Sequence, residues 1–230
     1  MLNLKLKKGL KYYKNLINYL KFLNSSVQHI FLENVCVLCK KSAHTFLCFD
    51  CRSTITYSFI TRNQHEFNHV YLSPYSSPLR SLIHHVKFNH NLEAIEFLKG
   101  KLKNIDKRYF SEIDYWIPIP YHNNRLQERG FNFLNLLFHD FFLSCGLCRL
   151  DLFIRSKNTK PLHNLTISER KAELSNAFEY GFDVHFLKGK SVVLVDDILT
   201  TGTTVSYLIN LLKCLGCKDV KVFTLTHVEL

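Results

Sequence analysis

The side chains best suited to chemistry lie together near the end of the chain, in the stretch Val192-Val-Leu-Val-Asp-Asp-Ile-Leu-Thr-Thr-Gly-Thr-Thr-Val205. The apolar, β-branched run from Ser191 to Val195 is typical of a strand that is buried on both faces. It leads directly into two carboxylates, Asp196 and Asp197. Because ligands of open α/β sheets bind at the carboxyl ends of the strands, these carboxylates are placed to accept hydrogen bonds from sugar hydroxyls.

A threonine-rich turn follows the two acids and is suited to a phosphate group. It consists of Thr200, Thr201, Gly202, Thr203 and Thr204. Gly202 can adopt a positive φ angle and lets a ligand approach the backbone. The helix predicted from Thr203 to Leu215 begins with exposed N–H groups, which favour a bound anion together with the helix dipole. No lysine follows the glycine, so the turn is not a Walker-type P-loop.

A second turn carries the positive charge that a diphosphate needs. The strand-like segment Trp116-Ile-Pro-Ile-Pro120 is followed by Arg125, Arg129 and Gly130, at the start of a helix predicted over residues 131–143. Arginine offers planar, bidentate and permanently charged donors, which match the oxygens of a diphosphate. Taken alone, the turn has a second interpretation, as a surface turn that docks a phenylalanine on the protein.

The acid and threonine segment, VVLVDDILTTGTTV, resembles the phosphoribosyl-diphosphate signature of the type I phosphoribosyltransferases. The resemblance implies that Asp196 and Asp197 contact the 2′ and 3′ hydroxyls of the ribose. It also implies that residues 200–204 hold the 5′-phosphate, and that Mg²⁺ bridges the diphosphate and ribose oxygens.

With the Pro-x-Pro strand end and Arg129-Gly-Phe-Asn132, the segment resembles the ComF family of competence-associated proteins, from about Val35 to Thr226. That resemblance implies catalytic roles for Asp196, Asp197, Arg129 and Arg170, charge balance by Arg155, and ligand contacts by Lys87, Arg125, Gly130 and residues 200–204. The chain departs from the family pattern at Leu162 and Glu173, where Gln and Asn are frequent. Both lie in the segment that by analogy forms a mobile flap over the ligand.

Four cysteines closer to the N-terminus have the spacing of a metal site. The pairs Cys36-x-x-Cys39 and Cys48-x-x-Cys51 are separated by eight residues, as in two zinc knuckles. Tetrahedral thiolate coordination of Zn²⁺ organises a segment that is too short to form its own core, so we predict a closed, structural zinc site. A redox pair and buried thiols are the alternatives. His44 is a conceivable substitute ligand, but the four cysteines already fill the four coordination positions.

Two further C-x-x-C pairs, Cys145/Cys148 and Cys214/Cys217, each surround a glycine at the expected end of a helix. A glycine at this position is typical of the Schellman motif that ends many helices, and the apolar character of cysteine explains the pairs without a metal. A second metal site is the open alternative. The twelve histidines show no metal-ligand spacing and are predicted to be surface or helix positions.

The elements that position these groups alternate between strand and helix from Ile113 onward. Strands are predicted at 113–120, 150–155, 191–195 and 220–226, and helices at 79–103, 131–143, 168–178 and 203–215. This alternation predicts an α/β fold, a type I phosphoribosyltransferase-like parallel sheet flanked by helices on both faces. We expect a basic amphipathic helical extension over 1–31, a four-Cys zinc module over 32–60 and a phosphoribosyltransferase-like domain over 61–230.

The charge balance favours an anionic partner. Thirty Lys and Arg against nineteen Asp and Glu give a net charge of +11, which suits nucleic acid, phosphorylated ligands or an acidic membrane surface. The alternative is a basic but merely solvated surface, and for residues 1–31 a helix docked on the body. No run of about 20 apolar residues predicts a transmembrane helix, and no secretory signal is recognisable. We therefore expect a cytoplasmic protein, with peripheral contact to the inner membrane as an option.

Two functions fit these features. The first is a ComF-like protein that binds phosphoribosyl diphosphate and single-stranded DNA during natural transformation, with a helicase or inner-membrane channel as partner. Basic charge, zinc knuckles and interspersed aromatic residues suit backbone neutralisation with base stacking. The second is an active phosphoribosyltransferase that positions diphosphate and Mg²⁺ and transfers 5-phosphoribosyl to a base or amine, although no residue stands out as a general base.

Overall fold

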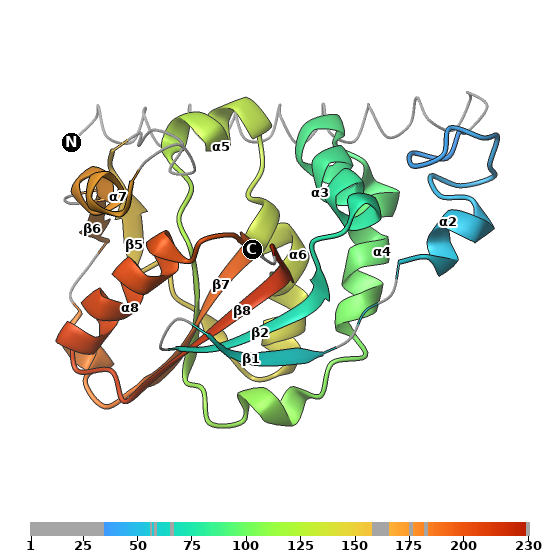
Figure 1. Ribbon diagram of the computed structural model, residues 1–230. Coiled ribbons are helices and arrows are strands. Elements are labelled where there is room, and N and C mark those ends of the chain that lie inside the picture. Colours follow the sequence, from blue (N-terminus) through green and yellow to red (C-terminus); the bar gives the residue numbers. More distant parts are fainter. Residues whose placement is uncertain are drawn as a thin grey trace, which may run out of the picture.

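The computed structural model describes residues 35–55, 57, 59–64, 67–157, 166–174, 177–181 and 184–228 (Figure 1). The helix expected over residues 1–31 and the departure at Leu162 lie outside these ranges. The strands are β1 (Ile60–Gln64), β2 (Phe67–Pro74), β3 (Tyr115–Pro118), β4 (Cys148–Arg149), β5 (Phe153–Arg155), β6 (Phe178–Tyr180), β7 (Ser191–Leu199) and β8 (Asp219–His227). The helices are α2 (Phe49–Ser53), α3 (Ser77–Asn89), α4 (Leu92–Leu102), α5 (Asn123–Arg129), α6 (Phe133–Ser144), α7 (Ile167–Leu174) and α8 (Thr203–Cys214), with 3₁₀ turns at Lys107–Phe110 and His185–Leu187.

The main sheet has six strands in the order β1-β2-β8-β7-β3-β4. Neighbouring strands pair in parallel, except that β1 pairs antiparallel with β2. Residues Val192 to Val195 of β7 are fully buried, as their apolar run predicted. Val193 and Val195 contribute to the hydrophobic cluster on one face of the sheet, whereas Val192 and Leu194 contribute to the cluster on the other. The predicted α/β fold with both faces covered is therefore confirmed.

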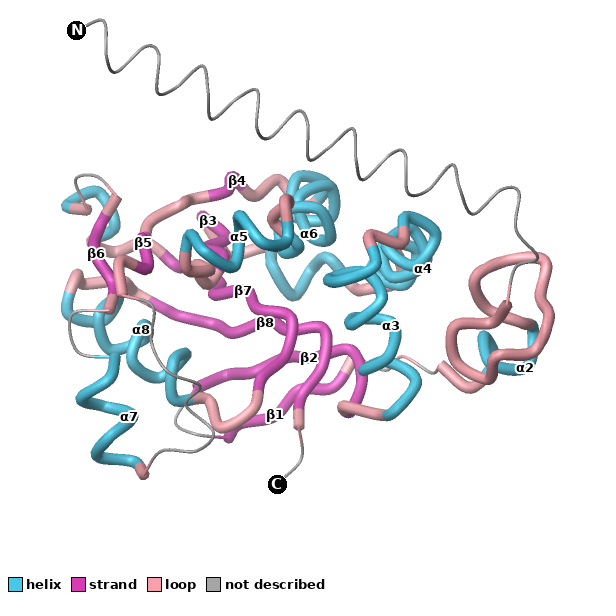
Figure 2. Tube along the Cα trace, turned by 90° about the horizontal axis from the view of Figure 1, so that it is seen from above, coloured by secondary structure: helices cyan, strands magenta, loops and turns pink. Residues whose placement is uncertain are grey.

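Helices α3, α4 and α6 cover one face of the sheet, and α7 and α8 cover the other (Figure 2). Between α6 and the sheet, Phe138, Phe142 and Phe223 pack against one another and Trp116 stacks on Phe142, with 5.1 Å between the ring centroids. Aromatic pairs of this kind contribute about 0.5–1.5 kcal/mol each beyond the area that they bury. This cluster fixes α6 on β3 and β8, the strands that flank β7.

The single helix predicted over residues 79–103 is wrong, because two helices, α3 and α4, occupy this stretch. Between them, His90 adopts a left-handed backbone conformation with a φ angle of 54°. The Asn91 side chain then accepts a hydrogen bond of 2.8 Å from the N–H of Ala94 and caps the start of α4. Because asparagine is a preferred N-cap residue, Asn91 was the sequence signal for the break.

Other elements also differ from the prediction. The strand expected at 150–155 lies outside the main sheet, because β5 pairs antiparallel with β6 in a separate two-stranded sheet. The helix expected over 168–178 ends at Leu174, and Phe178 begins β6. Strands β1 and β2 and helix α5 were not predicted. In β2 the polar residue His69 interrupts the apolar pattern, yet it is buried and hydrogen-bonded to Thr224 at 2.8 Å.

The four-cysteine segment lies beside α4 at one end of the molecule (Figure 1). Its Phe46 ring packs edge to face on Phe97 of α4, with 5.9 Å between the centroids. The N–H of Phe46 donates a 3.0 Å hydrogen bond to the carboxylate of Glu93. Cys36 and Leu47 are buried in the same hydrophobic cluster as α3, α4 and α6. The segment therefore packs against the main body, and the expected boundary between 60 and 61 stays a prediction.

Candidate functional site

The two acids that the sequence analysis singled out lie at the carboxyl end of β7. The strand is longer than predicted and continues through both residues to Leu199. Asp196 lies opposite Thr224 of β8, and on the other side the N–H of Ile119 donates to the Val195 carbonyl at 2.9 Å. The sheet itself therefore holds both carboxylates, with Asp197 buried and Asp196 partly exposed.

The buried carboxylate of Asp197 has two partners from outside β7. The Lys87 ammonium of α3 forms an ion pair with Oδ2, and the Tyr121 hydroxyl donates a hydrogen bond of 2.8 Å to the same oxygen. The backbone N–H of Asp197 in turn donates to Oδ1 of Asp196 at 2.8 Å. The structure thus brings Lys87 to the acid pair, where it neutralises Asp197.

Burial and proximity shift the protonation of this group. Burial, together with the charge of Asp197, raises the pKa of Asp196 from 3.8 to about 7, although Lys87 and Arg155 oppose the shift. Burial and the Asp197 charge also raise the pKa of Tyr121 well above its ordinary value of 10, so that its hydroxyl stays a hydrogen-bond donor at neutral pH. At neutral pH Asp196 is therefore partly protonated, whereas Tyr121 is fully protonated.

The threonine turn follows β7 directly and opens α8. Gly202 has a φ angle of 68°, a left-handed conformation that glycine adopts without steric cost, and it forms the N-cap of the helix. No side chain caps the first turn of α8, so its N–H groups are oriented as for a bound anion. The hydroxyls of Thr201 and Thr203 lie 3.0 Å apart, and Thr200 is exposed. Thr204 lies in the first turn of the helix.

The two arginines lie differently from the prediction. They do not begin the helix after Gly130 but belong to a short helix of their own, α5, which Gly130 ends with a φ angle of 78°. The guanidinium of Arg129 lies over the Tyr121 ring, 5.1 Å from its centroid. Because Tyr121 also contacts Asp197, Arg129 is joined to the acid pair through this one aromatic side chain. Arg125 is exposed on the same helix.

The remaining predicted residues belong to β5 and α7. Arg155 is half-buried in β5, and burial together with the charge of Arg125 lowers the pKa of its guanidinium, which Asp196 opposes. Arg170 belongs to α7, but its side chain lies outside the described residues. Glu173, one of the two departures from the family pattern, forms an ion pair with Lys157, with 3.2 Å between Oε2 and Nζ.

Tyr121 is the site residue that sequence reasoning missed. Its only sequence signal is its position directly after Pro120, at the end of the β3 segment. From there its hydroxyl reaches the carboxylate of the neighbouring strand and its ring supports an arginine. It joins the two halves of the site that the sequence presented as separate turns.

Replacing Tyr121 with Phe is expected to weaken binding of the expected ligand, phosphoribosyl diphosphate, by roughly 10- to 100-fold. The change removes a hydrogen bond to a charged group, which contributes about 1.5–3 kcal/mol, and keeps the ring under Arg129. Isothermal titration in the presence of Mg²⁺ measures it. Tyr109→Phe is the matched control, because the Tyr109 hydroxyl is buried without a hydrogen bond and its ring packs against Phe59 and Phe110. Equal affinity of both variants would contradict a role for the Tyr121 hydroxyl.

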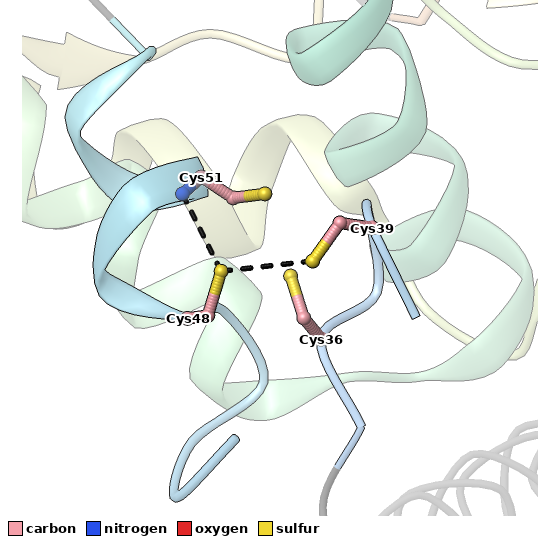
Figure 3. Close-up of side chains that lie close together, drawn as sticks. All are labelled: Cys36, Cys39, Cys48 and Cys51. Carbon is pink, nitrogen blue, oxygen red and sulfur yellow. Dashed lines mark hydrogen bonds between the residues drawn. The ribbon is translucent and has the colours of Figure 1, made fainter. Parts of the chain in front are cut away.

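The four predicted metal ligands, Cys36, Cys39, Cys48 and Cys51, converge on one point (Figure 3). All four sulfur atoms lie within 4.8 Å of one another, and those of Cys39 and Cys48 are 3.7 Å apart. Tetrahedral zinc with Zn–S bonds of about 2.3 Å requires sulfur–sulfur distances of about 3.8 Å. Within the described ranges, no other group of three or more His, Cys, Asp or Glu side chains converges in this way. The donor set and its spacing fit a metal ion such as zinc.

The protonation of these thiols is unequal without a cation. Burial opposes ionisation of Cys36, but the N–H groups of Cys39 and Cys48 outweigh it and lower its pKa to about 6. Burial and the neighbouring sulfur atoms raise the pKa of Cys51 to about 12. A divalent cation removes this conflict, because it stabilises all four groups as thiolates.

The other two C-x-x-C pairs lie at helix ends, as predicted. Gly146 and Gly216 have φ angles of 79° and 80° and follow α6 and α8. The N–H of Leu147 donates to the Phe142 carbonyl at 3.0 Å, and the N–H of Cys217 donates to the Leu212 carbonyl at 3.2 Å. These are the hydrogen bonds of a Schellman motif, so the expected helix-ending role of both pairs is confirmed.

No helix in the part of the chain that the structure describes has the length and apolar character needed to cross a membrane.

Comparison with known proteins finds a match to the phosphoribosyl transferase domain family over residues 126–228. "DNA utilization protein YhgH" of Escherichia coli O6:H1 is 31% identical over 207 residues, which cover 83% of this chain and 89% of the relative. "Competence protein F" of Haemophilus influenzae is 25% identical over 212 residues, 86% of this chain and 93% of the relative. "Competence protein ComFC" of Streptococcus pneumoniae is 27% identical over 205 residues, 89% of this chain and 85% of the relative.

Among solved structures, one described as the allosteric regulatory enzyme of purine biosynthesis matches with a TM-score of 0.32 and 15% identity. The match covers 55% of this chain and 23% of that structure.

Proposed function

The chain belongs to the ComF family of competence and DNA-utilization proteins, and from this premise we propose that it binds phosphoribosyl diphosphate with Mg²⁺ and acts in the handling of DNA during uptake. The relatives named for competence and DNA utilization match over most of their length. In this proposal the ligand lies at the carboxyl edge of β7, where the acids, the threonine turn and the arginine helix meet.

The connection from Asp197 through Tyr121 to Arg129 carries this proposal. A phosphoribosyl diphosphate ligand needs hydrogen-bond acceptors for its ribose and cations for its diphosphate within one small site. The Tyr121 hydroxyl contacts Asp197 at 2.8 Å while its ring supports the Arg129 guanidinium at 5.1 Å. Acceptor and cation are therefore held together by one rigid side chain.

The proposed roles follow from the chemistry of each group. Asp196 and Asp197 accept hydrogen bonds from the ribose hydroxyls, and the first turn of α8 holds the 5′-phosphate. Arg125 and Arg129 balance the diphosphate, with Arg155 and Arg170 as the further cations that the family resemblance assigns. When the ribose binds to Asp197, the Lys87 ammonium leaves this carboxylate and binds the phosphate oxygens of the ligand.

Oxygen donors surround this edge of the sheet, which suits a hard cation such as Mg²⁺. The described protein groups supply two adjacent carboxylates, of which Asp197 already has two partners. We therefore infer that Mg²⁺ would come to the site as a complex with the diphosphate, whose charge it would neutralise, while the protein groups position the ligand.

The structural metal that we propose for the four cysteines is zinc, since a closed set of four thiolates selects it. Reduced thiols of this kind suit the cytoplasm, which is where we place the protein. Its net charge of +11 favours single-stranded DNA as a partner, delivered by a helicase or a channel of the uptake machinery.

Isothermal titration with phosphoribosyl diphosphate, with and without Mg²⁺, tests the ligand. We expect binding with Mg²⁺ and weaker binding in its absence, whereas absence of binding under both conditions would refute the proposal. Fluorescence anisotropy with a single-stranded oligonucleotide across a salt series tests the partner separately. For binding through phosphate contacts, the logarithm of the binding constant falls linearly with the logarithm of the salt concentration. No binding at low salt would exclude the DNA role.

One observation favours an active phosphoribosyltransferase as the second candidate. The pKa of Asp196, raised to about 7 by burial and by Asp197, suits a group that exchanges protons at neutral pH. Diphosphate release from phosphoribosyl diphosphate, measured with a panel of bases and amines, distinguishes the two functions. Binding without turnover for every acceptor would exclude the enzyme.

A further inference from the structure

Aromatic rings of the core lie beside two cations of the proposed site. The Lys87 ammonium lies 5.3 Å from the centroid of the Phe133 ring, and the Arg155 guanidinium lies 5.6 Å from that of Phe178. Phe133 is fully buried and Phe178 is 9% exposed, and both belong to the hydrophobic clusters of the sheet. Packing of the core therefore accounts for the positions of these two rings.

A third ring, that of Phe88, lies beside a site cation without being part of the core. Phe88 follows Lys87 on α3, and it is 60% exposed. The Arg129 guanidinium lies 5.8 Å from the centroid of its ring, close enough for a cation–π attraction. The adjoining pocket has a volume of about 420 Å³ and is lined by Lys87, Phe88, His90, Arg125, Glu128 and Arg129. Because most of the ring stays in contact with water, hydrophobic burial explains little of its position.

Arg129 is in contact with two separate parts of the chain through aromatic rings. Besides Phe88 of α3, it lies over Tyr121, which follows β3, at 5.1 Å from the ring centroid. The Phe88 ring is itself ordered by His84, one helical turn earlier, with 4.5 Å between the centroids and 35° between the planes. Arg125, on the same helix as Arg129, lies over no ring among the residues that the structure describes.

Contact with a ring leaves the hydrogen-bonding capacity of a guanidinium intact. The group attracts the ring through its flat π face, whereas its five N–H donors point outward in the plane of the group. A carboxylate partner would occupy those donors, but an aromatic partner does not. Arg129 can therefore be held by Phe88 and Tyr121 and still offer bidentate hydrogen bonds to phosphate oxygens.

We propose that Phe88 is a positioning residue, which holds the Arg129 guanidinium in place for the diphosphate of the ligand and acts only through this arginine. A free arginine loses rotamer freedom when it binds a phosphate, and this loss weakens binding. An arginine that is already ordered by two rings loses less. The inference rests on the proposed function, because phosphoribosyl diphosphate supplies the diphosphate that Arg129 binds.

Replacing Phe88 with Leu, which keeps an apolar side chain but has no π face, is expected to weaken binding of Mg²⁺-diphosphate and of phosphoribosyl diphosphate. The expected loss is roughly 2- to 12-fold, the effect of ordering one long side chain. Phe88→Trp keeps a π face and should restore the affinity to within twofold of the parent. Ribose 5-phosphate, which lacks the diphosphate, should bind all variants within twofold. Titration calorimetry measures each affinity.

Phe186→Leu is the matched control, because Phe186 is also an exposed phenylalanine, at 42%, but lies in the 3₁₀ turn before β7. It should bind Mg²⁺-diphosphate like the parent. A double-mutant cycle then shows whether Phe88 acts through Arg129. In an Arg129→Gln background Phe88→Leu should cause no further loss, whereas in an Arg125→Gln background it should cause its full loss.

The order of the arginine can also be measured without a ligand. Nuclear magnetic resonance relaxation gives the order parameter of the Nε–H group of each arginine. The value for Arg129 should fall in Phe88→Leu and recover in Phe88→Trp. The value for Arg125, which lies on the same helix, should stay the same in all variants and so controls for a change in the helix itself.

Unchanged affinity for Mg²⁺-diphosphate in Phe88→Leu would overturn the proposal. So would an equal loss for ribose 5-phosphate, or a loss that persists in the Arg129→Gln background, because Phe88 would then act on the fold or on another group. Failure of the parent to bind phosphoribosyl diphosphate is a different result, which refutes the proposed function. The order parameter of Arg129 in Phe88→Leu then still decides whether the ring positions this arginine.

Discussion

Replacing Asp196 and Asp197 together with asparagine is expected to weaken binding of phosphoribosyl diphosphate by roughly 100-fold or more. Each hydrogen bond to a charged acceptor contributes about 1.5–3 kcal/mol, and the double substitution removes the charge from two of them. Titration calorimetry with Mg²⁺ measures the loss. Single-stranded DNA, if it binds through the basic surface, should keep its affinity in the same variant. Retention of ligand binding would remove the acid pair from the site.

The single variant Asp196→Asn shows whether such a loss reflects the site or the fold. In the folded protein the pKa of Asp196 is about 7, against an ordinary value of 3.8. Between pH 4 and 7 the folded chain therefore keeps a proton that the unfolded chain has lost, so the stability of the parent falls as the pH rises through this window. Asparagine has no charge to bury.

Asp196→Asn should consequently melt on the order of 10 °C above the parent at pH 8 and close to it near pH 4. A shift of about 3 pKa units corresponds to about 4 kcal/mol, and 1 kcal/mol corresponds to about 2–4 °C in a chain of this size. Thermal denaturation across this pH range measures the difference. A variant that melts below the parent at pH 8 would show that the carboxylate stabilises the free protein. Asp197→Asn should have the opposite effect and lower the melting temperature, because it removes the charged partner of both Lys87 and Tyr121.

If the four cysteines hold zinc as we propose, substitution of Cys36 with Ser is expected to abolish zinc binding and to unfold residues 35–55. A structural zinc site supplies roughly 10–16 kcal/mol in small zinc-binding peptides, and three thiolates bind far more weakly than a closed set of four. Cys36 is fully buried, so its loss also opens the cluster that contains Phe46 and Leu47. Elemental analysis should find one Zn²⁺ per parent chain, and hydrogen exchange should show lost protection over residues 35–55 in the variant.

Cys214→Ser is the control, because Cys214 is an exposed thiol at the end of α8 and lies outside the cluster. It should retain zinc and full protection. Removal of the metal from the parent with a strong chelator should reproduce the Cys36→Ser result. Full protection of the four-cysteine segment without metal would show that packing against α4 suffices to fold it.

The main features of the fold were predictable because their patterns are local. The apolar run of β7 and the glycine-containing turn after it have few other structural interpretations, and the cysteine spacing predicted a cluster that the structure brings together. The break at His90 and Asn91 was missed because the apolar periodicity continues across it. Strand β2 was missed because two of its buried polar groups, the His69 ring and the Ser73 carbonyl, bond to Thr224 and Thr226 of β8, which are distant in sequence.

The site was predictable in its parts and not in its assembly. The charged residues of each turn could be recognised in the sequence. The ion pair of Lys87 with Asp197 could not, because it joins residues 110 positions apart in the chain. The placement of Tyr121 between Asp197 and Arg129 depends on the neighbouring positions of β3 and β7 in the sheet. Periodicity and spacing carry no information on such pairings, which arise only when strands that are distant in sequence become neighbours.

Helix α3 carries Lys87 and Phe88 as consecutive residues, one on the buried carboxylate and the other on the open pocket. The ion pair connects α3 to β7, and the Arg129 guanidinium over the Phe88 ring connects α3 to α5. A ligand that took Asp197 from Lys87 would therefore remove one of these two connections and leave the other. By linkage, any change that strengthened the ion pair would weaken that ligand by the same factor.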